Sequence, residues 1–174
     1  NDIKVRLNKN TVPSILNLEQ VNKLCNELKN PIENEKQFLL YQFKNRILPG
    51  VDETSKMKAS FLRDIIFNKE YSPIINKIDA IKILGTMQGG YNVEIMINLL
   101  NNNQLAPYVV EELKNTILIF DYYYTIEKLY KKGNPFAKKI IESWASGEWF
   151  KNKTKVPEKI SLTVFKVNGE INTD

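Results

Sequence analysis

The 174-residue sequence has no histidine and only one cysteine, Cys25. Without histidine, the chain lacks the commonest general base, the commonest metal ligand and every His-containing catalytic triad. A single thiol excludes an internal disulfide, which is typical of a reducing compartment, and it cannot alone hold an iron–sulfur cluster. We therefore expect a cytoplasmic chain with no catalytic residue and no metal site of its own, in which Cys25 is a small buried apolar residue.

Long apolar runs are missing as well. No apolar stretch approaches the roughly 20 residues that span a membrane, and no secretory signal opens the chain, so we expect no membrane contact. The adjacent glycines Gly89 and Gly90 are not followed by the GK[ST] motif of a phosphate-binding loop. The length and the hydrophobic fraction of 43% predict one globular domain, or one domain and the start of another. Asn1, rather than Met, opens the sequence, which suggests that the natural start lies upstream.

Helical periodicity and capping residues predict eight short helices. Asn17, Asp52, Asn92 and Asn134 each stand directly before such a pattern and are expected to cap it. The predicted helices cover about 18–29, 33–46, 53–66, 77–84, 93–100 and 107–117, then 122–132 and a last one from 135 onward. Leu18 and Phe38 are expected on the apolar stripes of the first two helices.

The spacing of these helices predicts an all-α fold. Short connections make consecutive helices antiparallel neighbours, giving about four pairs. The pairs recur every 30 to 40 residues or so, which is the spacing of HEAT-like solenoids. We therefore expect a HEAT-like α-α superhelix.

The pattern changes after Pro157. Residues 159–167, KISLTVFKV, are rich in β-branched residues and are followed by the turn signal Asn168-Gly169. One strand cannot bury itself, so we expect its sheet to be supplied from outside this chain, which would then end just past a domain boundary. The expected domains are an irregular leader at 1–16, a helical domain at 17–156 and the first strand of a further domain at 157–174.

Two glycine-containing turns are the candidate functional sites. The stretch LGTMQGGYNV (84–93) carries the polar and glycine residues Gln88, Gly89, Gly90, Tyr91 and Asn92. Adjacent glycines permit positive φ or a close backbone approach, at an entropic cost that a plain connection between helices does not need. The stretch PGVDE adds Pro49, Gly50 and Asp52. Each turn is either a tight connection between packed helices or a surface that faces a partner.

Several stretches together resemble the N-terminal region of bacterial aconitase B. They fall in the order found in that family and cover most of the chain, and only residues 1–16 match poorly. The chain has LPGVDE where the family usually has PPGVDE, which leaves Pro49-Gly50 in place. The matching stretches are LKNPIENEKQFLLYQFKNRILPGVDE (28–53), ILGTMQGGYNV (83–93), FDYYYTIEKLYKKGNPFAKKIIESWASGEWF (120–150) and PEKISLTVFKVNGEINTD (157–174).

This resemblance implies a HEAT-like domain followed by the first strand of a swivel domain. The parent enzyme would be an aconitate hydratase of the tricarboxylic acid cycle, which interconverts citrate and isocitrate through cis-aconitate with a four-iron four-sulfur cluster. Hydration of 2-methyl-cis-aconitate is a further activity that this family suggests. The cluster ligands and catalytic residues of the family would lie downstream of this chain. The HEAT-like domain would pack beside the catalytic and swivel domains, help form a substrate tunnel and contribute to a homodimer.

The excess of basic residues leaves a second interpretation open. The formal charge is +5, and residues 128–166 hold ten lysines against three glutamates. A solvated helix surface explains this pattern, whereas RNA binding is the sharper alternative, because basic faces can follow phosphates. The aconitase B family is reported to bind messenger RNA when its cluster is lost, which makes a stand-alone scaffold for protein or RNA the alternative function. The RNA-contact candidates are Lys131, Lys132, Lys138 and Lys139.

Overall fold

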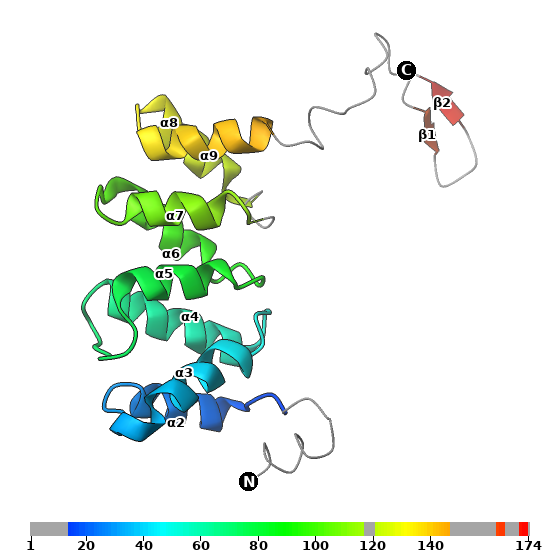
Figure 1. Cartoon of the computed structure of the whole chain (residues 1–174). Coiled ribbons are helices and arrows are strands. Elements are labelled where there is room, and N and C mark those ends of the chain that lie inside the picture. The colour runs from blue at the N-terminus through cyan, green and yellow to red at the C-terminus, as the bar shows by residue number, and fades with distance from the viewer. Residues whose placement is uncertain (1–13, 117–120, 147–162, 166–170, 174) are drawn as a thin grey trace. The chain divides into compact units, whose positions relative to one another are not determined.

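A computed structural model describes residues 14–116, 121–146, 163–165 and 171–173 of the chain. The chain divides into two compact units, Asn1–Ile141 and Glu142–Asp174. Up to residue 146, the described residues contain eight α-helices and the short 3-10 helices η1 and η2. They are α2 (Leu18–Glu27), η1 (Glu33–Glu35), α3 (Lys36–Asn45), α4 (Glu53–Ile66), α5 (Lys77–Gly85), α6 (Val93–Asn98), η2 (Leu99–Asn101), α7 (Ala106–Leu113), α8 (Tyr123–Lys131) and α9 (Pro135–Ala145). Figure 1 labels the α-helices. The prediction of a helical fold is confirmed for this part.

Local side-chain caps explain where several helices begin. The side chain of Asn17 accepts a hydrogen bond from the backbone N–H of Gln20, and the side chain of Gln20 accepts one from the backbone N–H of Asn17. This reciprocal pair is a capping box. Asp52 accepts from the first turn of α4, and Asn134 accepts from the first turn of α9. These three predicted caps are confirmed.

Asn92 occupies the N-cap position of α6 as predicted, but the expected side-chain cap is absent. Asn92 precedes α6 with φ −85° and ψ −29°, and its side chain makes no capping hydrogen bond. Its amide nitrogen instead donates backward to the carbonyl oxygens of Leu84 (2.7 Å) and Met87 (3.2 Å). Asn92 is itself buried, so its amide nitrogen donates to the carbonyl oxygens that lie within reach at the end of α5 and just beyond it.

Two residues predicted on apolar stripes lie on the surface. Leu18 is the first residue of α2 and is 45% exposed, because the buried face of that helix begins at Val21. Phe38 is 53% exposed, since the buried face of α3 is formed by Leu39, Gln42 and Phe43 and Phe38 lies roughly a quarter turn away.

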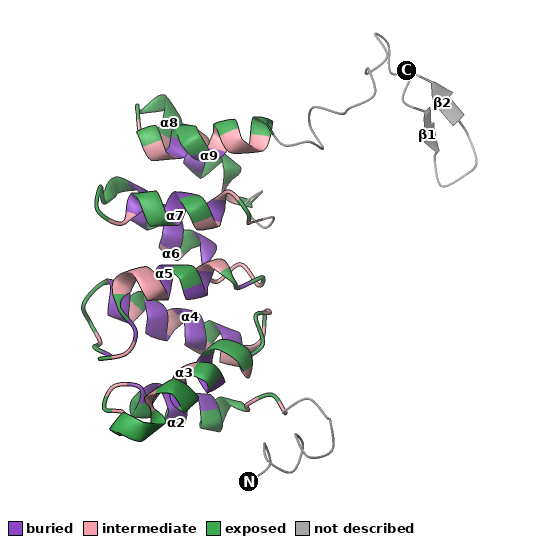
Figure 2. Ribbon diagram, in the orientation of Figure 1, coloured by how far each residue is buried: buried purple, intermediate pink, exposed green. Residues whose placement is uncertain are grey.

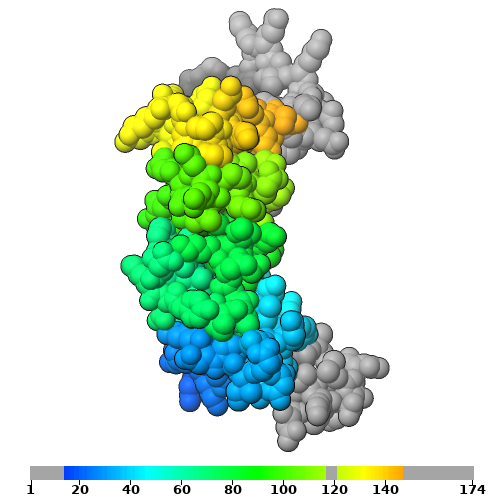
Figure 3. Space-filling model, turned by 60° about the vertical axis from the view of Figure 1, so that its left-hand side comes forward, coloured from blue at the N-terminus to red at the C-terminus, as the bar shows by residue number. Residues whose placement is uncertain are grey.

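Helices α2 to α7 pack on helices close to them in the sequence. α2 contacts α3 and α4, α4 contacts α5, and α7 contacts α5 and α6. Figure 3 shows the same order, because the colours of the helical unit follow one another without mixing. Buried residues lie between the helices and exposed residues on their outer faces, as Figure 2 shows. None of the described helices is long and apolar enough to cross a membrane.

The second unit contains two short described strands. β1 (Thr163–Phe165) pairs antiparallel with β2 (Ile171–Thr173), and Val164 stands opposite Asn172. The expectation that the strand in 159–167 lacks a partner within this chain is therefore wrong. The predicted boundary between residues 156 and 157 lies outside the described residues, and most of the predicted leader 1–16 does as well.

Candidate functional site

The two candidate turns lie against each other. The first turn, residues 49–52, joins α3 to α4, and the second turn, residues 88–92, joins α5 to α6. The backbone N–H of Gln88 donates to the carbonyl oxygen of Pro49 at 2.6 Å. The hydroxyl of Tyr91 donates to the carbonyl oxygen of Val51 at 2.8 Å. Both turns emerge at the same edge of the helical unit, on the right in Figure 1. We call residues 49–52 and 88–92 the paired turns.

Gly89 is required at this contact for a steric reason. A Cβ atom added to Gly89 would lie 1.8 Å from the carbonyl oxygen of Gly50 and 2.4 Å from its carbonyl carbon. Those atoms are backbone and cannot swing aside as a flexible side chain can. The expectation that adjacent glycines allow a close backbone approach therefore applies to Gly89, and the approaching backbone belongs to the first turn.

Gly90 and Asn92 shape the second turn from within. Gly90 has φ +87°, a left-handed conformation that favours glycine, and a Cβ atom there would meet nothing within 4 Å. Asn92 is fully buried, and its two hydrogen bonds to Leu84 and Met87 tie the turn to the end of α5. Its amide oxygen has no hydrogen-bond partner among the described residues. Asn92 therefore fixes the backbone of the turn instead of facing outward.

Asp52 anchors the other turn at the start of α4. Its carboxylate accepts hydrogen bonds from the hydroxyl and backbone N–H of Thr54 and from the hydroxyl and backbone N–H of Ser55. The hydrogen bond from the Thr54 side chain is the largest cause that lowers the pKa of Asp52 to about 2, and those from Ser55 add to it. Asp52 is consequently an ionised cap at neutral pH.

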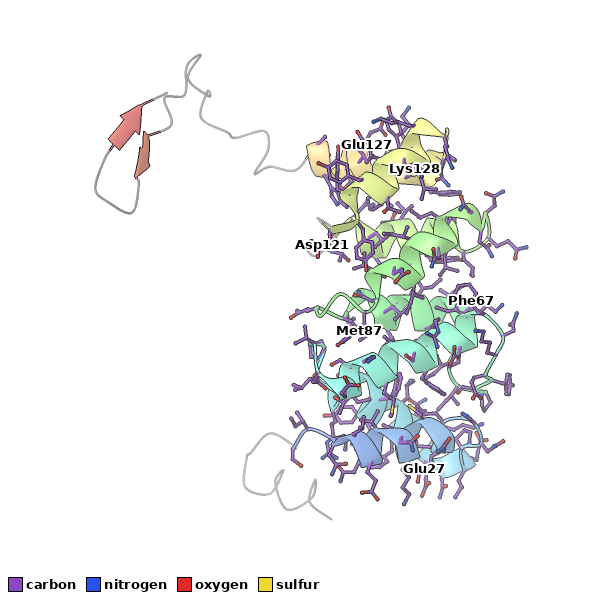
Figure 4. The ribbon with its side chains drawn as sticks, turned by 180° about the vertical axis from the view of Figure 1, so that it is seen from behind. Glu27, Phe67, Met87, Asp121, Glu127 and Lys128 are labelled. Atoms are coloured by element: carbon purple, nitrogen blue, oxygen red, sulfur yellow. The ribbon has the colours of Figure 1, made fainter. Side chains whose placement is uncertain are left out.

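The paired turns present both polar and apolar groups to solvent. Gln88 is exposed, Tyr91 is partly exposed, and Val51 is 74% exposed. Met87, which Figure 4 labels, directly precedes the second turn and is 3% exposed. Val51 belongs to the candidate stretch PGVDE, but nothing in the sequence indicates its contact with Tyr91. The only local hint of the pairing is that both turns contain glycine.

The four lysine candidates form no part of the paired turns. Lys131, Lys132, Lys138 and Lys139 are all exposed and belong to α8, α9 and the turn between them. Figure 4 shows Glu127 and Lys128 on α8 at the far end of the helical unit from α2. Lys131 forms an ion pair with Glu127 at 3.0 Å, so part of this basic surface is already neutralised.

The described residues do not fit an iron–sulfur cluster. Such clusters need several thiolates, and this chain has one cysteine, Cys25. Cys25 is 6% exposed on α2, and burial raises the pKa of its thiol to about 12, which opposes formation of a thiolate ligand. Elsewhere in the described ranges, no three His, Cys, Asp or Glu side chains gather in a way that could hold a metal ion. The prediction that Cys25 is a buried apolar residue is confirmed.

Comparison with known proteins gives a consistent result. Residues 1–150 match the family model described as the aconitate B N-terminal domain. Aconitate hydratase B of Pseudomonas aeruginosa is 48% identical over 99% of this chain, and that of Escherichia coli is 45% identical over 93%. Aconitate hydratase B of Helicobacter pylori is 39% identical, also over 93%. The chain spans about a fifth of the length of these relatives, 19–20%.

The family match covers the whole helical unit, both of the paired turns and the four candidate lysines. The resemblance drawn from the sequence motifs is therefore confirmed. The chain belongs to the aconitase B family and corresponds to its N-terminal domain.

Proposed function

We propose that this chain is the non-catalytic N-terminal domain of an aconitate hydratase, a hydro-lyase that interconverts citrate and isocitrate through cis-aconitate. Membership of the family supports the activity of the parent enzyme. The four-iron four-sulfur cluster and the residues that act on substrate would belong to the remaining four-fifths of the parent. Within the parent, α2–α9 would form the HEAT-like superhelix, and β1 and β2 would open the swivel domain. This assignment is supported by the packing of α2 to α7 on their near neighbours in sequence.

The role we propose for the paired turns is to face the catalytic part of the parent at the mouth of its substrate tunnel. The observation that carries this proposal is the close approach of Gly89 to the carbonyl group of Gly50. Two turns that only connect helices would not need a contact that excludes every side chain at one position. The contact keeps Gln88, Tyr91 and Val51 in fixed positions at the surface, which suits a surface that must fit a partner.

The sharpest test of this role is Gln88→Ala in the full-length enzyme. Gln88 donates to Pro49 through its backbone N–H and its side chain is exposed, so the substitution leaves the pairing of the turns intact. We expect aconitase activity to fall several-fold while the unfolding temperature changes by less than about 2 °C. Gln37→Ala, at an exposed position on α3, is the matched control and should change neither quantity. Equal activity of the two variants would refute the role.

Gly90→Val is a less selective test of the same role. Valine is strained at φ +87°, so both the free energy of unfolding and the aconitase activity should fall. The proposal is supported only if the activity falls by more than the loss of stability explains.

A stand-alone protein is the alternative, and the size of the native chain separates the two. An antibody raised against this chain would detect a band near 20.2 kDa if the domain exists alone, and a band about five times larger if it is part of an aconitase. A homodimer formed through this domain would be detected by sedimentation of the native protein.

RNA binding is the second candidate function, favoured by the exposure of Lys131, Lys132, Lys138 and Lys139 on neighbouring segments. Contacts between these lysines and phosphates would make the affinity for RNA fall steeply as salt is raised. Binding that stays constant between about 50 and 200 mM salt would contradict a phosphate-contact mechanism.

A further inference from the structure

Lys58 is an exceptionally buried charged residue. It lies in the second turn of α4 and is 1% exposed. Its ammonium nitrogen lies 3.3 Å from the carbonyl oxygen of Lys44, to which it donates, and 5.5 Å from the centre of the Phe43 ring. Burial alone lowers the pKa of Lys58 to about 8, and no carboxylate in the described part of the chain pairs with it. A buried ammonium without an acidic partner lowers stability, so a role elsewhere is needed to explain it.

The acceptor of this hydrogen bond lies at the end of α3. Lys44 belongs to the last turn of that helix, where carbonyl groups have no partner within the helix. Three residues before Lys58, the single hydroxyl hydrogen of Ser55 is shared between the carbonyl oxygen of Leu48 at 2.5 Å and the Asp52 carboxylate at 2.8 Å. Residues three apart lie on the same side of a helix, so α4 holds both carbonyl groups from one face.

These two hydrogen bonds lead directly into the paired turns. Leu48 is followed by Pro49, whose carbonyl oxygen accepts the hydrogen bond from the backbone of Gln88. The carbonyl groups of residues 44, 48 and 49 are thus held by α4 and by the second turn within six residues of chain. A shift at the end of α3 would be transmitted to the contact between the turns.

We propose that Lys58 is a positioning residue for the paired turns: together with Ser55 it fixes the carboxyl end of α3 on α4 and so sets where the first turn meets the second. An apolar residue of similar volume would make the helical unit more stable but would leave the carbonyl group of Lys44 without its donor. The geometric claim stands on the contacts described above, and only its consequence for the parent enzyme rests on the proposed function.

Hydrogen exchange of the Gln88 amide in the 174-residue chain tests this proposal, because that amide donates across the contact between the turns. In Lys58→Met, we expect the unfolding midpoint to rise, since an unpaired buried charge is removed. We expect the Gln88 amide nevertheless to exchange about fivefold faster, because its local opening becomes easier. A residue that only affected global stability would slow exchange of Gln88 together with that of the core amides.

Two further variants keep the result decisive. Lys56→Met removes a lysine from the same helix whose side chain is 57% exposed, and it should change neither the midpoint nor exchange at Gln88. Ser55→Ala should speed exchange at Gln88 without raising the midpoint. Unchanged or slower exchange at Gln88 in Lys58→Met would overturn the proposal, whatever Ser55→Ala does. Full activity of Gln88→Ala in the parent enzyme would refute the proposed function, but it would leave these exchange results unaffected.

Discussion

Replacing Gly89 with alanine should pull the two turns apart. The added Cβ atom would lie 1.8 Å from the carbonyl oxygen of Gly50, whereas a carbon and an oxygen in contact need about 3.3 Å. The turns must therefore separate by about 1.5 Å. That movement takes the bond from Gln88 to Pro49, now 2.6 Å, beyond hydrogen-bonding distance, and it weakens the bond from Tyr91 as well.

The cost of Gly89→Ala follows from these losses. Each hydrogen bond contributes about 1 kcal/mol net, and forced repacking adds about 1–3 kcal/mol. We expect the free energy of unfolding to fall by about 2–4 kcal/mol, which lowers the unfolding temperature by about 6–12 °C for a domain of this size. Urea unfolding followed by circular dichroism measures the first quantity and calorimetry the second.

Two other glycines are matched controls for this prediction. At Gly50 an added Cβ would be 3.7 Å from the Asp52 carboxylate, an ordinary contact, so Gly50→Ala should change stability by less than about 0.5 kcal/mol. At Gly90 there is space but φ is +87°, so Gly90→Ala should cost about 1 kcal/mol through the backbone alone. A Gly89→Ala variant as stable as Gly50→Ala, or more stable than Gly90→Ala, would refute the steric argument.

Three other substitutions or conditions test the fold and its buried groups. Folding lowers the pKa of Lys58 from 10.5 to about 8, so the unfolded chain binds this proton more tightly than the folded chain does. The free energy of unfolding should therefore rise by about 1 kcal/mol between pH 7 and pH 9 relative to that of Lys58→Met. The same pH dependence of urea unfolding in the two proteins would contradict this. Asn92→Ala removes the side-chain donor to the carbonyl groups of Leu84 and Met87, of which Leu84 keeps the backbone N–H of Met87, and should cost about 1–3 kcal/mol in the urea-unfolding assay, while a loss below about 0.5 kcal/mol would count against it. Because burial raises the pKa of the Cys25 thiol to about 12, a disulfide reagent should label Cys25 quickly in urea and only at the rate of opening in the native chain, and rapid native labelling would show that the thiol is accessible.

The helices could be predicted from the sequence because their signals are local. Asn17, Asp52 and Asn134 act on amides two or three residues away, so a short window of sequence contains both partners. Asn92 looked the same in sequence but bonds to carbonyl groups five and eight residues earlier, where the competing acceptors are created by the fold. Tertiary demand for a buried donor decided the outcome at this position.

The pairing of the turns could not be predicted in the same way. Tyr91 and Val51 are 40 residues apart, and neither residue type indicates such a partner. The burial of Lys58 could not be predicted either, because a lysine between Met57 and Ala59 is expected at a solvated position on an amphipathic helix. Both features depend on how α3, α4 and α5 stack, which capping and periodicity do not encode.

The contact between the turns constrains some positions and leaves others free. Its acceptors are the backbone carbonyl groups of Pro49 and Val51, and one of its two donors is the backbone N–H of Gln88. The side chains of Val51 and Gln88 can therefore change without breaking the contact, whereas Gly89 cannot acquire a Cβ atom. A surface built in this way can adapt its exposed side chains to a partner while its backbone geometry stays constant. If the paired turns face the catalytic part of the parent enzyme, substitutions at Val51 and Gln88 should alter activity at constant stability, and substitutions at Gly89 should alter both.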